Sequence, residues 1–103
     1  MSEAARVRID VWLWRARFAK TRAGAAALVT EGAVRLVRLG SSRALDKASH
    51  PVAPGDVLAF AQSGRLRLVR VEALGTRRGP PAEARALYAE LEAEPNADIG
   101  GLA

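Results

Sequence analysis

Nine lysine and arginine residues and one threonine are placed where they could contact phosphate groups. Lys20 and Arg22 flank Thr21, the residue at which a helix is expected to begin. The first amides of a helix have no intrahelical acceptor and carry the positive end of its dipole, so cations beside them favour a bound anion. An ordinary solvated basic exterior is the alternative. The candidate phosphate contacts are Arg8, Arg15, Lys20, Thr21, Arg22, Arg35, Arg43, Lys47, Arg77 and Arg78.

Residues that could support catalysis or hold a metal are scarce. The chain has no cysteine, and its one histidine, His50, stands before a proline in an expected turn. Asp10 is more simply explained as a helix cap than as a catalytic carboxylate. No nucleophile–base pair, phosphate-binding glycine loop or metal-ligand cluster can be assembled from these residues. We therefore expect no catalytic residues, no metal and no cofactor, and we exclude an enzyme.

Charge is divided unevenly along the 103 residues. Residues 1–78 contain 15 Lys and Arg against 6 Asp and Glu, whereas residues 79–103 contain 1 against 5. A basic body with an acidic end favours a polyanionic partner, with nucleic acid ahead of a membrane surface. No apolar run approaches the roughly 20 residues that span a bilayer. Together with the missing cysteine and signal-peptide pattern, this favours a cytoplasmic protein.

The N-terminal part is expected to form two short helices that position these cations. In the first, Asp10 is the predicted N-cap and Ile9 a hydrophobic staple against Trp14. One face of this helix is apolar: Ile9, Trp12, Leu13 and Ala16. Trp12 and Trp14 lie about 200° apart around the helix, and we interpret both as packing residues, with base stacking by one of them as the alternative.

The second helix is predicted from Thr21 to Gly32. Thr21 is its expected N-cap, and Gly32 stands where a left-handed residue commonly ends a helix. Its buried stripe is predicted to be Ala25, Leu28 and Val29.

Strands and one further helix are expected after Gly32. We predict strands at residues 33–37, 57–61 and 65–73, a mainly basic loop at 39–50 with a short strand near Arg43 to Leu45 as an alternative, and a type II turn at Pro54-Gly55. Arginines of mixed parity in the last strand suggest a bulge or an edge strand. Pro80 and Pro81 suit the first turn of a helix that runs to about Glu94. The expected organisation is a leader at 1–7, one domain at 8–74, a basic loop and helix at 75–95, and a tail at 96–103.

A series of short motifs resembles the S-four (alpha-L) RNA-binding domain. The motifs are Arg8-Ile9-Asp10, Leu13, Thr21-Arg22, Ala25, Leu28-Val29, Gly32, Val34 and Pro54-Gly55-Asp56-Val57-Leu58. Further motifs are similar to the fifteen-kilodalton ribosome-associated heat-shock protein class of that family: Asp10 to Trp14, Arg17-Phe18, Lys20 to Arg22, Arg77 to Ala84 and Leu87-Tyr88. One departure is the family's Asn-Gly turn, which is replaced by Val37-Arg38-Leu39-Gly40 and an expected longer loop.

The resemblance implies an α+β alpha-L fold, with two N-terminal helices packed on a small bent antiparallel sheet, plus a C-terminal helix. It also implies a non-enzymatic protein that binds structured RNA, with large-subunit ribosomal RNA and peptidyl-tRNA as partners, in the rescue of stalled nascent-chain complexes. We expect a monomer. The alternatives are an accessory module for another RNA in tRNA or rRNA maturation, and a protein-interaction module with a basic face.

Overall fold

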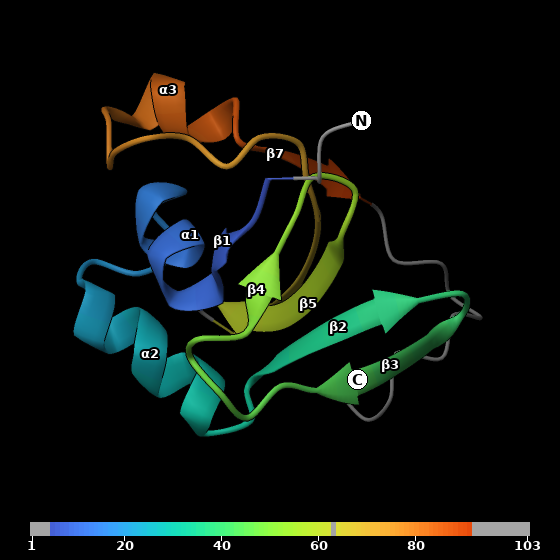
Figure 1. Cartoon of the computed structure of the whole chain (residues 1–103). Helices are drawn as coiled ribbons and strands as arrows, with labels where there is room; N and C mark the ends of the chain where they lie inside the picture. The colour runs from blue at the N-terminus through green and yellow to red at the C-terminus, as the bar shows by residue number, and fades with distance from the viewer. Residues whose placement is uncertain (1–4, 63, 92–103) are drawn as a thin grey trace.

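A computed structural model of the chain describes residues 5–62 and 64–91 (Figure 1). Two helices near the N-terminus lie against an antiparallel sheet, so the expected α+β architecture is confirmed. The elements in chain order are β1 (Val7–Arg8), α1 (Ile9–Arg15), α2 (Arg22–Thr30), β2 (Val34–Arg38), β3 (Ser41–Ala44), β4 (Pro51–Val52), β5 (Val57–Gln62), β6 (Arg65–Val71), α3 (Pro81–Arg85) and β7 (Tyr88–Leu91).

The main sheet has five antiparallel strands in the order β3-β2-β5-β6-β7, and β1 pairs separately with β4. One hydrophobic core lies between this sheet and the first two helices. The expected face of α1 is buried, since Ile9, Trp12 and Leu13 are completely inaccessible to solvent. They pack with α2 and with the inward side chains of the sheet, which include Val34, Leu36, Leu58, Phe60 and Val69.

The start of α1 differs from the prediction. The helix begins at Ile9 with Arg8 as its N-cap, two residues earlier than an N-cap at Asp10 implies, and Asp10 lies in its first turn. The amides of Ile9 and Asp10 donate to the backbone carbonyls of His50 (2.8 Å) and Ala48 (3.3 Å), so these early donors need no side-chain cap. The predicted N-cap at Asp10 and staple at Ile9 are therefore wrong. The Asp10 carboxylate instead accepts from the Arg8 guanidinium and from the Val11 amide.

The end of α1 has an arginine where glycine is usual. Arg17 has a φ of 66°, which lies in the left-handed region. The Phe18 amide donates to the Leu13 carbonyl (2.9 Å) and the Arg17 amide to that of Trp14 (3.1 Å), which is the Schellman pattern of a helix end. The chain thus turns sharply at Arg17 and leads directly to α2.

Helix α2 begins and ends as expected. The Thr21 hydroxyl accepts from the Gly24 amide at 2.9 Å, and Gly32 has a φ of 78°. Ala25 and Val29 are fully buried, while Leu28 packs against the core from a half-buried position. The sequence prediction for this helix is confirmed.

The connection between β2 and β3 is a tight two-residue turn. Arg38 pairs with Ser41, and the intervening Leu39 and Gly40 both have positive φ angles, of 51° and 80°. This is the twist that two-residue hairpins favour, and it usually requires Asn-Gly or Gly-Gly. The expected longer loop at this point is wrong, since the backbone keeps the hairpin turn although leucine replaces asparagine.

Leu39→Asn is expected to raise the free energy of unfolding by about 1 kcal/mol, because a left-handed conformation strains a residue such as leucine far more than asparagine. Leu39 is fully exposed, so no packing is lost. Urea unfolding of the two proteins measures the difference. Leu39→Ala is the control, since it removes the side chain but keeps a strained Cβ. Equal stabilisation by both variants would show that the exposed side chain, and not the backbone, is the cause.

The C-terminal region departs most from the prediction. The expected helix to Glu94 is replaced by the short α3, after which β7 pairs with β6 from Val71–Tyr88 to Leu68–Leu91. Strand β6 therefore lies inside the sheet, and its register with β5 is continuous from Val57–Arg70 to Gln62–Arg65. The predicted bulge or edge strand is wrong. The N-terminal leader is described only from Ala5, and Val7 pairs with Val52; the predicted tail at 96–103 lies outside the described residues.

An exposed ion pair joins β6 to β7 and is expected to make stability depend on pH. The Arg67 guanidinium donates to both Glu90 oxygens (2.8 and 2.6 Å), which lowers the pKa of Glu90 below its ordinary 4.5. A depressed carboxyl pKa stabilises the fold above pH 4.5, and this contribution is lost as the pH falls through the folded-state value. Wild type should exceed Glu90→Gln in urea resistance at pH 7 and lose that advantage near pH 3. An unchanged difference across this range would contradict the role of the pair.

Candidate nucleic-acid interface

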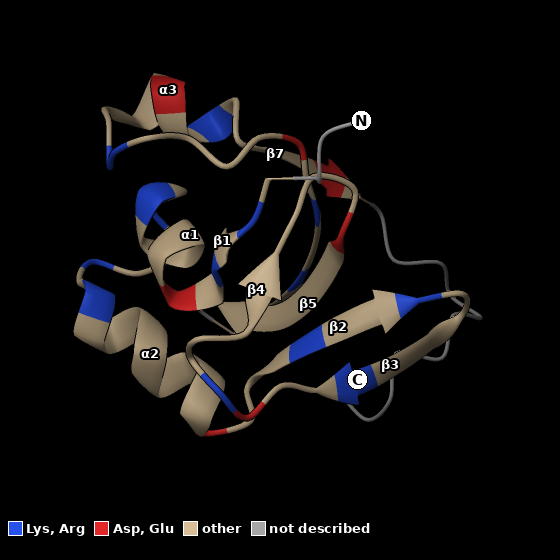
Figure 2. Cartoon of the chain, in the orientation of Figure 1, with Lys and Arg blue, Asp and Glu red and all other residues tan. Residues whose placement is uncertain are grey.

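The predicted phosphate contacts fall mainly into two groups on the surface (Figure 2). The first, which we call the helix-end edge, lies where α1 ends, α2 begins and the connection between β6 and α3 (residues 72–80) passes. The second, which we call the hairpin surface, lies on β2, β3 and the segment that leads to β4. The helix-end edge consists of Arg15, Lys20, Thr21, Arg22, Arg77 and Arg78, and the hairpin surface of Arg35, Arg43 and Lys47.

Three arginines hold the β6–α3 connection against the end of α1. Nη1 of Arg15 donates to the carbonyls of Gly75 (2.9 Å) and Leu74 (3.4 Å). Nε of Arg78 donates in the opposite direction, to the Trp14 carbonyl at 3.1 Å, and Nε of Arg17 to that of Gly79 at 2.6 Å. Two predicted contacts, Arg15 and Arg78, are therefore half-buried and engaged within the protein. Arg17 was absent from the predicted set of phosphate contacts, although it stands in the Arg17-Phe18 motif of the family resemblance.

Lys20 and Arg22 are the cations of the helix-end edge that remain available. Both are exposed, and within residues 5–62 and 64–91 neither forms an ion pair. Thr21 between them uses its hydroxyl as the cap of α2, so its contribution is to fix the start of the helix. The two cations thus stand on either side of a helix N-terminus, which is the arrangement that the sequence predicted for an anion.

Arg77 completes the edge but is partly neutralised. Its guanidinium donates to both oxygens of Glu83 in α3, at 3.1 and 2.8 Å. The pairing raises the pKa of Arg77 and lowers the pKa of Glu83. Both side chains are largely exposed, so the pair is weak and can open toward a stronger anion.

The hairpin surface contains one cation that is held by hydrogen bonds and two that are exposed. Arg35 donates across the β2–β3 pair to the Ser42 hydroxyl (3.0 Å) and carbonyl (3.2 Å). Arg43 and Lys47 are exposed, and Nη2 of Arg43 lies 3.4 Å from Nε2 of His50. Arg8 belongs to neither group. Its ion pair with the buried Asp10 raises the pKa of the guanidinium, although half of the Arg8 side chain stays exposed.

Trp12 and Trp14 differ in burial, as their spacing requires. Trp12 is fully buried, and its Nε1 donates to the Ala73 carbonyl at 2.9 Å. Its ring also lies near that of Phe18, at 6.0 Å between centroids. Trp14 is half-buried against the same core. The interpretation of Trp12 as a packing residue is confirmed, and this ring is unavailable for base stacking.

The described part of the chain has neither a candidate metal site nor a helix that could span a membrane. Residues 5–62 and 64–91 gather no three His, Cys, Asp or Glu side chains that could hold a metal ion. In the same residues, no helix combines the length and apolar character needed to cross a membrane. His50 lines a polar pocket together with Arg6, Arg38 and Asp56.

The fold and these basic groups define an S4 domain protein. The family model for the S4 domain matches residues 7–36, which include α1, the helix-end turn, α2 and the start of β2. Among known proteins, the chain is 38% identical over 86 residues to the Heat shock protein 15 homolog of Haemophilus influenzae and 39% identical over 87 residues to Heat shock protein 15 of Escherichia coli. Each match covers 84% of this chain, and the chain spans about 62% of the length of these relatives.

The structural comparison gives the same result. The Heat Shock Protein 15 structure from Vibrio cholerae is similar with a TM-score of 0.73 and 33% identity, over 84% of this chain and 83% of that chain. The chain belongs to the heat shock protein 15 family. Membership of this non-enzymatic family confirms the expectation that the chain is not an enzyme. The Vibrio cholerae protein is described as trimeric, which weighs against the monomer expected from the sequence.

Proposed function

We propose that this chain is an RNA-binding protein that docks on structured ribosomal RNA of the large subunit and acts in the recycling of stalled nascent-chain complexes. The observation that carries the RNA part is the pair of exposed, unpaired cations in the described chain, Lys20 and Arg22, on either side of the Thr21-capped start of α2. The ribosomal target rests on membership of the heat shock protein 15 family.

The helix-end edge suits the RNA backbone better than base edges. A-form RNA hides its major groove, so a protein reaches mainly its phosphates, 2′-hydroxyls and overall shape. Lys20 and Arg22 supply positive charge, and the amides of Arg22 and Ala23, which precede the Gly24 amide bound by Thr21, supply directed donors. The connection that bears Arg77 is held to α1 by hydrogen bonds from Arg15 and Arg17, so the edge has a fixed shape before RNA binds.

Sedimentation of the tagged protein in cell lysate tests this function. We expect it to migrate with free large subunits, more so after translation is stalled, and less so as the salt concentration rises. Retention at the top of the gradient under every condition would refute the ribosomal target. If migration with subunits required intact RNA but did not respond to stalling, an accessory role in tRNA or rRNA maturation would replace the rescue role. Association that survives nuclease treatment would indicate a protein-interaction module instead.

A further inference from the structure

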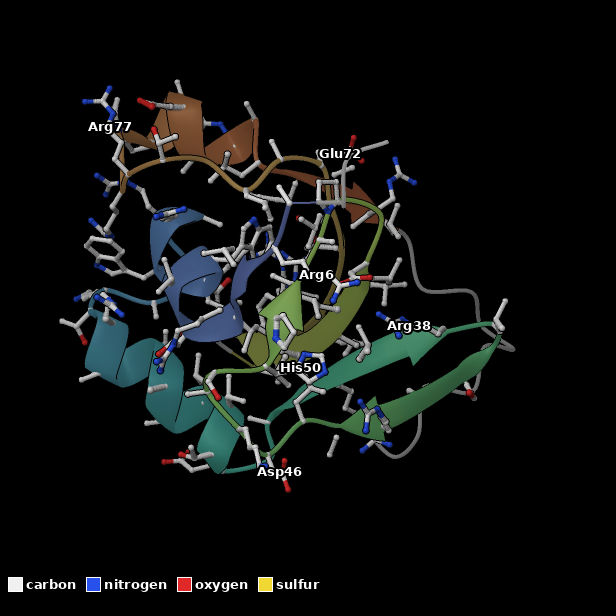
Figure 3. The ribbon with its side chains drawn as sticks, viewed as in Figure 1. Arg6, Arg38, Asp46, His50, Glu72 and Arg77 are labelled. Atoms are coloured by element: carbon white, nitrogen blue, oxygen red, sulfur yellow. The ribbon has the colours of Figure 1, made fainter. Side chains whose placement is uncertain are left out.

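A polar pocket lies beside the hairpin surface, away from the helix-end edge. Its volume is about 300 Å³, and it is lined by Arg6, Arg38, His50, Pro51, Ala53 and Asp56. Figure 3 shows Arg6, Arg38 and His50 on one face of the molecule, around β4 and the end of β2. Neither Arg6, Arg38 nor His50 belongs to the predicted set of phosphate contacts.

Regular backbone pairing fixes the walls of this pocket. Strand β1, which follows Arg6, pairs with β4 through Val7–Val52 and Arg8–Pro51. The His50 carbonyl accepts from the Ile9 amide at 2.8 Å, so the residue before β4 is tied to the start of α1. Paired strands and the start of α1 therefore fix the backbone of the pocket at His50 and Pro51 and next to Arg6.

The acidic residue of the pocket is already satisfied. Asp56 accepts from Nη2 of Arg38 at 3.2 Å through one oxygen and from the Ala53 amide at 3.0 Å through the other. Its side chain is only 15% exposed, whereas that of Arg38 is 62% exposed. Asp56 thus orients the Arg38 guanidinium, whose other N–H groups still face solvent. Because a guanidinium has five donors, this contact leaves most of them free.

The pocket has more positive than negative charge, and it also has hydrogen-bond donors without an acceptor among the described residues. Arg6 is exposed and has no ion-pair or hydrogen-bond partner among the described residues. Nδ1 of His50 is buried and makes no hydrogen bond within that part of the chain. Since a guanidinium only donates, the contact of Arg43 with Nε2 of His50 leaves the ring proton on Nδ1. The described residues leave this donor, in the wall of the pocket, without an acceptor.

We propose that the pocket binds a phosphate group between Arg6 and the Asp56-oriented Arg38, with His50 as a third donor. Guanidinium groups match phosphate oxygens in geometry and charge, and a partner that holds one of them in place lowers the cost of binding. Arg43 and Lys47 extend the positive charge beyond the pocket, which favours a phosphate that belongs to a larger anion. That the phosphate belongs to an RNA backbone rests on the proposed function; a free phosphate compound presents the same chemistry.

Titration of the full chain with inorganic phosphate, followed by ¹H–¹⁵N NMR, tests the pocket. We expect the amides of Ala53 and Asp56 and the Nε–H of Arg38 to shift in a saturable manner. Arg6→Gln and Arg38→Gln should each weaken binding about threefold or more. Arg70→Gln is the matched control, because Arg70 is an exposed arginine of β6 that pairs with Glu72 just after that strand, and it does not line the pocket. No saturable shift in the wild type, or equal weakening by the control, would overturn the proposal.

A second measurement distinguishes the sources of the phosphate. If it belongs to RNA, Arg6→Gln should lower the salt slope of RNA binding by about 0.7–0.9. If only inorganic phosphate responds to this variant, the ligand is a free phosphate compound. Lys20→Gln with Arg22→Gln tests the proposed function separately, since it should weaken RNA binding and leave phosphate binding at the pocket unchanged. The two measurements therefore test the phosphate pocket and the proposed RNA-binding function independently.

Discussion

Replacement of Trp12 by alanine is expected to lower the free energy of unfolding by about 3–5 kcal/mol, the cost of removing a large aromatic side chain from a packed core. Trp12 is completely buried between α1 and the sheet, and it contacts Phe18. Its Nε1 also holds the Ala73 carbonyl just after β6, so the variant leaves a cavity and frees this acceptor. Urea unfolding monitored by circular dichroism measures the loss.

Trp12→Phe separates packing from hydrogen bonding. Phenylalanine keeps most of the buried area but cannot donate to the Ala73 carbonyl. We expect a smaller loss of about 1–3 kcal/mol, which is the usual cost of leaving a partner unsatisfied together with a small cavity. If Trp12→Ala unfolded at nearly the wild-type urea concentration, the assignment of this residue to the core would be wrong.

Local rules predicted the N-terminal half of the fold well. The apolar period of Ile9, Trp12 and Leu13 and the capping chemistry of Thr21 depend on residues within one or two turns of each other, and both are found in the structure. The cap of α1 was missed because its first amides donate to carbonyls at Ala48 and His50. A sequence pattern contains no information on such distant acceptors.

The C-terminal strand was missed for a related reason. Leu87, Tyr88 and Leu91 have a spacing that fits one face of a helix, and a short apolar segment of this kind is ambiguous between helix and strand. The edge of β6 favours a strand here, because its backbone N–H and C=O groups form hydrogen bonds with β7. Arg67 also pairs with Glu90 across the two strands. The preference for a strand therefore comes from tertiary pairing.

The sequence predicted which cations lie at the candidate interface better than it predicted what each of them does there. Lys20 and Arg22 were found because they adjoin a helix start that is visible in the sequence. Arg15 and Arg78 belong to the same edge, but they donate to carbonyls 60 and 64 residues away. Residue type alone cannot distinguish an arginine that is free for a ligand from one that holds the backbone. Variants of the two kinds of cation should therefore differ in their effects on binding and on stability.

Neutralisation of the two exposed cations at the start of α2, in the double variant Lys20→Gln with Arg22→Gln, is expected to weaken binding to purified large ribosomal subunits about tenfold or more at physiological salt. Each lost phosphate contact should lower the salt slope of binding by about 0.7–0.9. Stability should change by no more than about 0.5 kcal/mol, because both side chains are exposed and unpaired among the described residues. Binding measured at several salt concentrations, beside urea unfolding, gives both quantities.

Arg15→Gln and Arg78→Gln are the contrasting variants from the same edge. Arg15→Gln removes two hydrogen bonds between α1 and the β6–α3 connection and Arg78→Gln removes one, so we expect the free energy of unfolding to fall by about 1–2 kcal/mol in each variant. Their effect on binding should follow from loosening of the edge, with a smaller change in salt slope than in the double variant. The opposite result would be a wild-type salt slope of binding in the double variant and a reduced salt slope in Arg78→Gln. The phosphate contacts would then lie on the β6–α3 connection, and the start of α2 would have only a structural role.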